Sequence, residues 1–174
     1  MGGSRAHLPE TEHIVVIGAM GSGKTTVGER LGRALGRVFH DSDRSIESRT
    51  ERSGREIAET DGVDALHRLE TEVLLESLAR EESAVIAAAA SVIEDPDVRG
   101  ALAGAFCVWL TADPGILAER SARGSHRRPV GQSEHLDNRD RLFRETADVV
   151  VDTGDRSVEE SVEFVVEALR DAEK

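Results

Sequence analysis

A glycine-rich segment, residues 18–25, limits the possible folds of this chain more sharply than any other part of the sequence. It reads Gly-Ala-Met-Gly-Ser-Gly-Lys-Thr and matches the pattern G-x-x-x-x-G-K-[ST]. The apolar run Ile14–Ile17 precedes it and predicts a strand, and the residues after it predict a helix. Because strand, loop and helix occur in this order, the sequence predicts a phosphate-binding loop at the start of a helix.

The residue types of this loop indicate how it binds a nucleotide triphosphate. Glycines allow the backbone to turn several N–H groups toward phosphate oxygens, and the helix adds its positive N-terminal end. Lys24 supplies a mobile positive charge, and the Thr25 hydroxyl can bind the Mg²⁺ that bridges the phosphates. The predicted nucleotide-binding residues are Gly21, Ser22, Gly23, Lys24, Thr25 and Thr26.

Apolar strand-like runs alternate with segments of helical period along the chain. The runs are Ile14–Ile17, Val38–His40, Val85–Ala89, Ala105–Leu110 and Val149–Val151. This alternation predicts an α/β fold in which helices cover both faces of a parallel sheet. The longest predicted helix runs from about Asp64 to Arg80 and is expected to pack on the sheet. Its apolar stripe consists of Leu66, Leu69, Val73 and Leu78.

Length and charge limit the classes of protein to which the chain can belong. The 174 residues suit one domain, and we expect a disordered tail over residues 1–12 and a single domain over 13–172. The formal charge of −12 argues against a nucleic-acid partner, because nucleic acids are polyanions. No apolar run approaches the roughly 20 residues of a membrane span. Cys107 is the only cysteine, which suits a reducing compartment, so we expect a cytoplasmic protein.

Two aspartates follow the second predicted strand. Asp41 and Asp43 lie where ligands bind in open α/β sheets, at the carboxyl ends of the strands. One carboxylate can contribute to the Mg²⁺ shell while the other contacts an acceptor hydroxyl, which suits phosphoryl transfer. Helix capping by Asp41 or Asp43 is the alternative, since a helix is predicted from Arg44 onward. Together with the phosphate loop, the pair favours the catalytic interpretation.

Taken together, these residues resemble the shikimate kinase family of small P-loop kinases, which are related in fold to nucleoside monophosphate kinases. The resemblance extends from about Ile14 to Leu169. It includes the phosphate loop, the two aspartates, Leu66-His67-Arg68-Leu69-Glu70, Val108-Trp109-Leu110, Ala112-Asp113-Pro114, Arg128-Pro129 and Val150-Val151-Asp152-Thr153. It implies a three-layer sandwich with a five-stranded parallel sheet and a mobile lid at about residues 120–135. The implied reaction is transfer of the γ-phosphoryl group of ATP, with Mg²⁺, to a hydroxyl of a small carboxylated ring, by a monomer.

The resemblance also implies roles for individual residues. These are catalysis for Lys24, Asp43 and Arg128, metal binding for Thr25 and Asp41, and substrate binding for Asp43, His67 and Arg139. Arg128 matches an arginine that closes over the transferring phosphoryl group, and Arg139 matches one that binds the substrate carboxylate. Independently of the resemblance, residues 120–144 contain seven arginines in an otherwise acidic chain. The glycines at 124 and 131 interrupt them, which predicts a hinged cationic cover.

The chain departs from the family's pattern at two places in the predicted acceptor pocket. The resemblance implies three consecutive glycines after the third strand, where this chain has Ala89, Ala90 and Ser91. It also implies a carboxylate-binding arginine at the position of His67, and the neighbouring Arg68 points about 100° further around the helix. Since the phosphoryl-transfer residues are retained, we expect a changed acceptor rather than an inactive protein.

The residues leave three functions open. The first is an ATP-dependent kinase of a small hydroxylated metabolite, with an acceptor that resembles shikimate or is a sugar acid such as gluconate. The second is a nucleotide-binding protein without transfer activity, which His67 and the alanine run favour and the retained Asp43 opposes. The third is a nucleoside monophosphate kinase, for which the sequence offers no identifiable base-recognition pocket.

Overall fold

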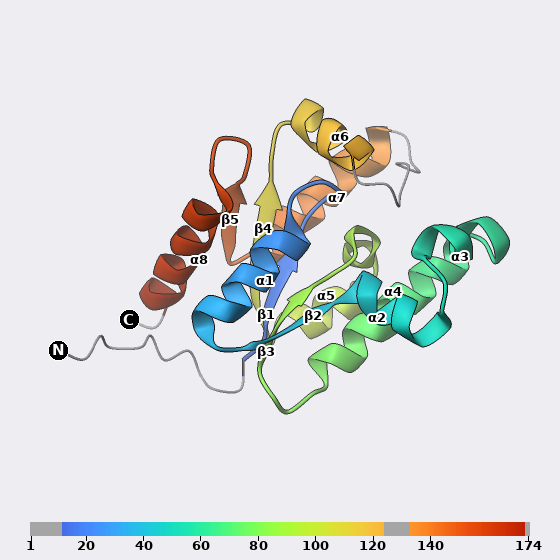
Figure 1. Cartoon of the computed structure of the whole chain (residues 1–174), viewed down its shortest axis with the longest axis horizontal. Coiled ribbons are helices and arrows are strands. Elements are labelled where there is room, and N and C mark those ends of the chain that lie inside the picture. The colour runs from blue at the N-terminus through green and yellow to red at the C-terminus, as the bar shows by residue number, and fades with distance from the viewer. Residues whose placement is uncertain (1–11, 124–132, 173–174) are drawn as a thin grey trace.

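The computed structural model describes residues 12–123 and 133–172, and its elements follow the predicted alternation (Figure 1). The strands in this part of the chain are β1 (Ile14–Ile17), β2 (Val38–Asp41), β3 (Ala84–Ala87), β4 (Phe106–Thr111) and β5 (Val149–Asp152). The helices are α1 (Lys24–Leu35), α2 (Ser42–Thr50), α3 (Gly54–Thr60), α4 (Val63–Leu78), α5 (Pro96–Leu102), α6 (Pro114–Arg123), α7 (Ser133–Thr146) and α8 (Val158–Ala172). A short 3₁₀ helix, η1 (Ala90–Glu94), follows β3.

The five strands form one parallel sheet with the order β2-β3-β1-β4-β5. The strand at its centre, β1, pairs on both sides, so that Val15 lies opposite Ile86 of β3 and Cys107 of β4. Every residue of β1 and β3 is buried, as expected for strands that are covered on both faces. The five-stranded parallel sheet predicted from the sequence is therefore confirmed.

Helices cover both faces of the sheet. On one face, α1 and α8 lie on the same side and pack against the strands, with Leu31 and Val165 fully buried between them and the sheet (Figure 1). The opposite face is covered by α4, α5 and α7, which contribute Leu74, Leu102 and Phe143 to a second apolar cluster. The predicted three-layer sandwich is confirmed.

Helix α4 begins and ends within two residues of the predicted bounds, but the prediction of what its apolar stripe contacts is partly wrong. Leu66 and Val73 pack with Ile46 of α2 and Ile57 of α3 in a separate small cluster. The sheet is contacted instead by the adjacent Leu74, with Leu75 and Leu78 beside it. The reason is that α2 and α3 fold over the outer side of α4, so two stripes of this helix are buried rather than one.

The carboxyl ends of β1, β2 and β3 meet at one edge of the sheet, and this edge carries the predicted functional residues. The phosphate loop follows β1, and Asp41 is the last residue of β2. Strand β3 ends at Ala87, earlier than predicted, because Ala89 turns the chain into η1. The alanines that follow β3 are thereby brought next to the phosphate loop.

The other sequence-based expectations are only partly covered by the described residues. The expected tail lies outside them apart from Glu12, and so does the central part of the expected lid, residues 124–132. The boundaries of the domain at 13 and 172 therefore stay predictions. None of the described helices is long and apolar enough to cross a membrane.

Candidate active site

The phosphate loop has the backbone geometry that its glycines predict. Gly18, Gly21 and Gly23 adopt positive φ angles of 146°, 83° and 97°, which side chains with a Cβ rarely allow. Gly23 precedes α1 and has no side chain, so no side-chain cap covers the N–H groups of the helix's first turn. Lys24 folds back over the loop, and its Nζ donates to the carbonyl oxygen of Ala19 at 3.0 Å. This arrangement suits an anion at the helix start.

Asp41 connects the second strand to the phosphate loop. Its Oδ2 accepts a hydrogen bond from the Thr25 hydroxyl at 2.6 Å, and its Oδ1 accepts from the backbone N–H groups of Asp43 at 2.9 Å and Arg44 at 3.2 Å. Asp41 therefore caps α2, which was the alternative interpretation, and the same carboxylate contacts the Thr25 hydroxyl. The roles of Asp41 and Thr25 in metal binding stay predictions. Asp43 does not cap the helix and lies in its first turn.

A small hollow of about 60 Å³ lies between the phosphate loop and the ends of β2 and β3. Its walls are Met20, Lys24, Thr25, Asp41, Ser42, Asp43 and the alanines at 87–90. We call it the transfer hollow, because it brings together the loop lysine and both predicted aspartates. The buried Ser42 hydroxyl, on its wall, has no hydrogen-bond partner among the described residues. A ligand that is rich in oxygen atoms would provide this hydroxyl with a hydrogen-bond partner.

The donors in this hollow fit Mg²⁺. This cation prefers oxygen ligands and takes only one or two of them from the protein, with the rest from phosphates and water. Thr25 and Asp41 provide such a pair, already joined by a hydrogen bond. The described residues contain no cluster of three or more acidic, histidine or cysteine side chains that could hold a metal ion.

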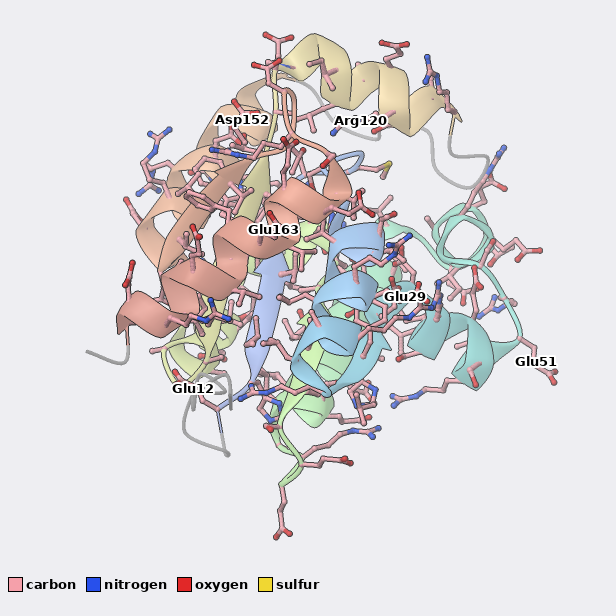
Figure 2. All side chains as sticks on the ribbon, turned by 60° about the vertical axis from the view of Figure 1, so that its left-hand side comes forward. Glu12, Glu29, Glu51, Arg120, Asp152 and Glu163 are labelled. Carbon is pink, nitrogen blue, oxygen red and sulfur yellow. The ribbon has the colours of Figure 1, made fainter. Side chains whose placement is uncertain are left out.

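A larger cavity of about 400 Å³ adjoins the outer side of the loop and includes Thr26, Asp43 and Arg120 on its walls. Arg120 donates from Nη1 to the Thr153 hydroxyl at 3.0 Å and from Nη2 to the Thr153 carbonyl oxygen at 2.8 Å. The Thr153 hydroxyl in turn lies 3.1 Å from the carbonyl oxygen of Ser22 in the phosphate loop. Figure 2 shows Arg120 and Asp152 at the same end of the molecule. Sequence reasoning missed Arg120, although the arginine-rich stretch was a signal for it.

A third cavity, of about 320 Å³, lies between α3, α4 and η1, and we call it the acceptor pocket. It is lined by Met20, Gly54, Arg55, Ala58, Glu59, Val63, Leu66, His67, Glu70, Ala90, Ser91 and Arg139. Met20 and Ala90 also line the transfer hollow, so the two spaces adjoin. Residues from both departures from the family's pattern, His67 and Ala90 with Ser91, thus line one pocket. That an acceptor binds there stays a prediction.

The structure gives Arg139 a partner that the sequence did not predict. Its Nη2 lies 2.8 Å from Oε2 of Glu94, at the end of η1. Glu70, which is only 1% exposed, accepts a hydrogen bond from the Ser91 hydroxyl. Sequence reasoning missed Glu70 as a pocket residue and Glu94 as the partner of Arg139. Arg128, the predicted lid arginine, lies outside the described residues.

The fold and this site define a small P-loop kinase. A family model described as shikimate kinase matches residues 20–170. The chain therefore belongs to the shikimate kinase family. It is an ATP-dependent phosphotransferase that uses Mg²⁺ and acts on a hydroxyl of a small metabolite.

Relatives and solved structures agree with this assignment. A shikimate kinase from Mycobacterium avium (strain 104) is 38% identical over 165 residues, which are 89% of this chain and 92% of that protein. One from Methylococcus capsulatus is 35% identical over 164 residues, 90% and 91% of the two chains. The structure of shikimate kinase from Acinetobacter baumannii in complex with shikimate has a TM-score of 0.83 at 29% identity, over 94% of this chain and 96% of the other. A gluconokinase from Sinorhizobium meliloti, with a TM-score of 0.60 at 22% identity, shows a shared fold alone.

Proposed function

We propose that the acceptor is a small hydroxylated metabolite that binds in the acceptor pocket and presents one hydroxyl to the transfer hollow. The observation that supports this is the common wall of the two spaces, formed by Met20 and Ala90. Asp43 lies on the wall of the transfer hollow, so a molecule in the pocket can extend a hydroxyl toward it across this common wall. The volume of about 320 Å³ is at the small end of ligand sites, which suits a single ring or a short polyol.

In this proposal the side chains around the transfer hollow each perform one task. The acceptor oxygen attacks the γ-phosphorus, its proton passes to Asp43, and the bond from phosphorus to the β,γ-bridging oxygen breaks, so that ADP leaves. Lys24 stabilises the negative charge that develops on the phosphoryl oxygens, and we assign the same task to Arg128. Thr25 and Asp41 hold Mg²⁺, which neutralises phosphate charge when it is bound.

We assign the remaining predicted residues to the binding of the nucleotide and the acceptor. Gly21, Ser22, Gly23 and Thr26 bind the phosphates with Lys24 and Thr25, while His67 and Arg139 contact the acceptor. We further propose that the protein acts as a cytoplasmic monomer without a nucleic-acid partner. The charge of −12 supports the last point, since a polyanion would be repelled.

The proposal is tested by incubating the protein with Mg-ATP and a panel of acceptors that includes shikimate and gluconate. Acceptor-stimulated release of ADP is the expected result for at least one member of the panel. Lys24→Ala should abolish transfer, and Asp43→Asn should retain ATP binding but lose acceptor-dependent turnover. The matched control is Asp97→Asn, which changes an exposed aspartate on α5. Unchanged turnover in Asp43→Asn would refute the role of Asp43.

Acceptor chemistry distinguishes this proposal from the two other functions considered. A nucleotide-binding protein without transfer activity would bind ATP and release no ADP with any acceptor. A nucleoside monophosphate kinase would form diphosphates from monophosphates. Membership of the family and the retention of Asp43 beside Lys24 both favour transfer to a metabolite hydroxyl.

A further inference from the structure

The chain that follows β3 takes its path without any residue that requires glycine. Ala89 is extended, with φ of −63° and ψ of 148°, and η1 begins with the next residue. In the part of the chain that the structure describes, Glu51 alone adopts a positive φ among the residues other than glycine. Ala89, Ala90 and Ser91 are therefore unstrained, and their Cβ atoms reduce the number of backbone conformations open to this segment.

Helix η1 depends on its surroundings for its position, because it has only five residues and the hydrogen bonds of a 3₁₀ helix have poor geometry. Val92 and Ile93 are buried in the apolar cluster between the sheet and the helices α4, α5 and α7. The carbonyl oxygen of Ile93 accepts a hydrogen bond from Nη1 of Arg99 on α5 at 2.7 Å. These contacts fix the side of η1 that faces the core.

Two polar side chains connect η1 to two further helices. The Ser91 hydroxyl donates to Glu70 of α4, which is 1% exposed. Glu94 accepts from Nη2 of Arg139 on α7 at 2.8 Å, in a partly buried ion pair. We call the Ser91–Glu70 and Glu94–Arg139 contacts the η1 braces. Both glutamates take part in further interactions, so the braces bear on the positions of these groups, and no net charge of the pocket follows from them.

The braces act on two groups that a ligand in the acceptor pocket meets. Ala90 precedes Ser91 and lies on the walls of both the transfer hollow and the acceptor pocket. Arg139 lies on the pocket wall, and the guanidinium has five N–H donors, of which Glu94 takes one on Nη2. Its buried Nε has no hydrogen-bond partner among the described residues, so a ligand oxygen, including that of a carboxylate, can accept from it. The braces therefore fix the junction of the two spaces and the direction of a pocket donor.

We propose that Ser91 and Glu94 are positioning residues of the transfer reaction, which act through Ala90 and Arg139. The proposal rests on the proposed function, because it assumes that the acceptor binds in this pocket. Ser91 keeps Ala90 at the junction and so sets how closely the acceptor hydroxyl approaches the γ-phosphorus. Glu94 keeps Arg139 turned toward the acceptor. Position matters at this scale, since a misplacement of about 1 Å costs an enzyme about 100-fold in rate.

The first test compares Glu94→Ala with Glu94→Gln, with shikimate as the acceptor. Both variants remove the negative charge, and only glutamine keeps an oxygen that can accept from Nη2 of Arg139. The difference between the two variants therefore measures position without charge. We expect KM for shikimate to be higher in Glu94→Ala than in Glu94→Gln by about fivefold or more, and KM for ATP to agree within about twofold.

The matched controls for this comparison are Glu163→Ala and Glu163→Gln, at an exposed position on α8 (Figure 2). Neither control should change KM for shikimate. Equal KM values for shikimate in Glu94→Ala and Glu94→Gln would overturn the role of Glu94.

The second test removes the other brace. Ser91→Ala deletes only the hydroxyl that donates to Glu70, and we expect kcat with shikimate to fall about five- to tenfold. Partial unfolding would also lower kcat, so the rates are divided by the fraction of molecules that bind a non-hydrolysable ATP analogue in calorimetry. Ser48→Ala on α2 is the matched control, since Ser48 is exposed. A corrected kcat equal to that of the wild type would overturn the role of Ser91.

Hydrogen exchange tests the braces without an acceptor. We expect the backbone amides of residues 88–95 to exchange about tenfold faster in Ser91→Ala and in Glu94→Ala, while those of β1 keep their wild-type rate. Unchanged exchange in residues 88–95 would overturn the proposal. Faster exchange with unchanged kinetics would overturn it as well, because η1 would then be braced without any effect on transfer.

The wild type distinguishes failure of this proposal from failure of the proposed function. If the wild type uses another member of the acceptor panel instead of shikimate, the same comparisons are made with that acceptor. Absence of ADP release from the wild type with every acceptor would refute the proposed function and the positioning roles together. Normal transfer by the wild type and by all of the variants would refute the positioning roles alone.

Discussion

At the scale of single residues, Asp41 shows how one carboxylate combines a structural task with a chemical one. Its Oδ1 caps the helix that carries Asp43, and its Oδ2 holds the hydroxyl of Thr25. The position of the predicted base and that of the predicted metal ligand are therefore coupled through a single side chain. The two tasks differ in what they require, because capping needs an oxygen acceptor and metal binding needs a negative charge.

This difference allows the two tasks of Asp41 to be separated by substitution. Asp41→Asn retains an oxygen for the cap, so we expect the free energy of unfolding to stay within about 0.5 kcal/mol of the wild type while the Mg²⁺ requirement rises. Asp41→Ala loses the cap as well, and stability should fall by about 1–2 kcal/mol. Urea unfolding and activity as a function of Mg²⁺ concentration measure the two effects. An asparagine variant that destabilises as much as alanine would contradict the separation.

The role of a residue could be predicted where a local sequence pattern indicates it. It could not be predicted where the residue's partner comes from a distant segment of the chain. The loop motif and the pair of aspartates follow from short spacing, and both lie at the predicted edge of the sheet. The pairing of Arg139 with Glu94 joins α7 to η1 and has no sequence signature. The same holds for Glu70, whose place on a helix next to apolar residues gives no hint that it is buried.

At the scale of elements, α6 packs directly against the phosphate loop. A Cβ at Gly21 would come within 2.5 Å of the carbonyl oxygen of Leu117 and 2.8 Å of the Ser121 hydroxyl, so helix and loop meet without room for a methyl group. The bonds of Arg120 to Thr153 attach the same helix to the end of β5. Helix α6 therefore supports the loop from outside, and changes at this contact should act on nucleotide binding.

Gly21→Ala tests the close contact between loop and helix. We expect it to weaken ATP binding by more than about tenfold, because it combines a strained positive φ with a steric clash against backbone. Gly36→Ala is the matched control, since Gly36 also has a positive φ of 67° but open space around its Cβ position. It should lower stability by about 1–2 kcal/mol and leave nucleotide affinity unchanged. Equal effects of both on ATP affinity would show that the contact is unimportant.

Arg120 tests the second attachment of α6. Arg120→Lys keeps the charge but cannot form both hydrogen bonds to Thr153, so KM for ATP should rise about three- to tenfold. Because Arg120 acts through the loop in this account, kcat should change less than twofold. Arg123→Lys is the control, as this neighbouring arginine is exposed and pairs only along its own helix with Glu119 among the described residues. A fall in kcat with unchanged KM would indicate direct contact with the reaction instead.

The order of elements was predictable from hydrophobic periodicity, whereas their contacts were not. The prediction for α4 placed its apolar stripe on the sheet, although Leu66 in fact packs with α2 and α3. A helix buried on two sides still shows a period close to that of a helix buried on one, so the number of neighbours cannot be read from the pattern. The same limit explains why the support of the phosphate loop by α6 was not foreseen.

At the scale of the whole molecule, the single cysteine lies near the centre of the sheet. Cys107 is 1% exposed and pairs with Val15 across β1 and β4. Burial, assisted by the negative charges of Asp148 and Glu12, raises the pKa of this thiol to about 12. The unfolded chain loses the proton at lower pH than the folded one, so the thiol's contribution to stability is lost as pH rises from about 9 to about 12. Cys107→Ala should lack this part of the alkaline decline in urea unfolding.

The same cysteine reports how nucleotide binding stabilises the entire fold. The thiolate is the reactive form, so a thiol reagent at pH 8 should label Cys107 only in molecules that have opened the sheet. A nucleotide that binds the folded state alone, at about 100 times its Kd, lowers the open population by about 100-fold. We therefore expect Mg-ATP to slow the labelling of the wild type by that factor. In Lys24→Ala, we expect the labelling rate to be the same with and without Mg-ATP. If the labelling rate does not change when nucleotide is bound, the centre of the sheet must open without disturbing the phosphate loop at the end of β1.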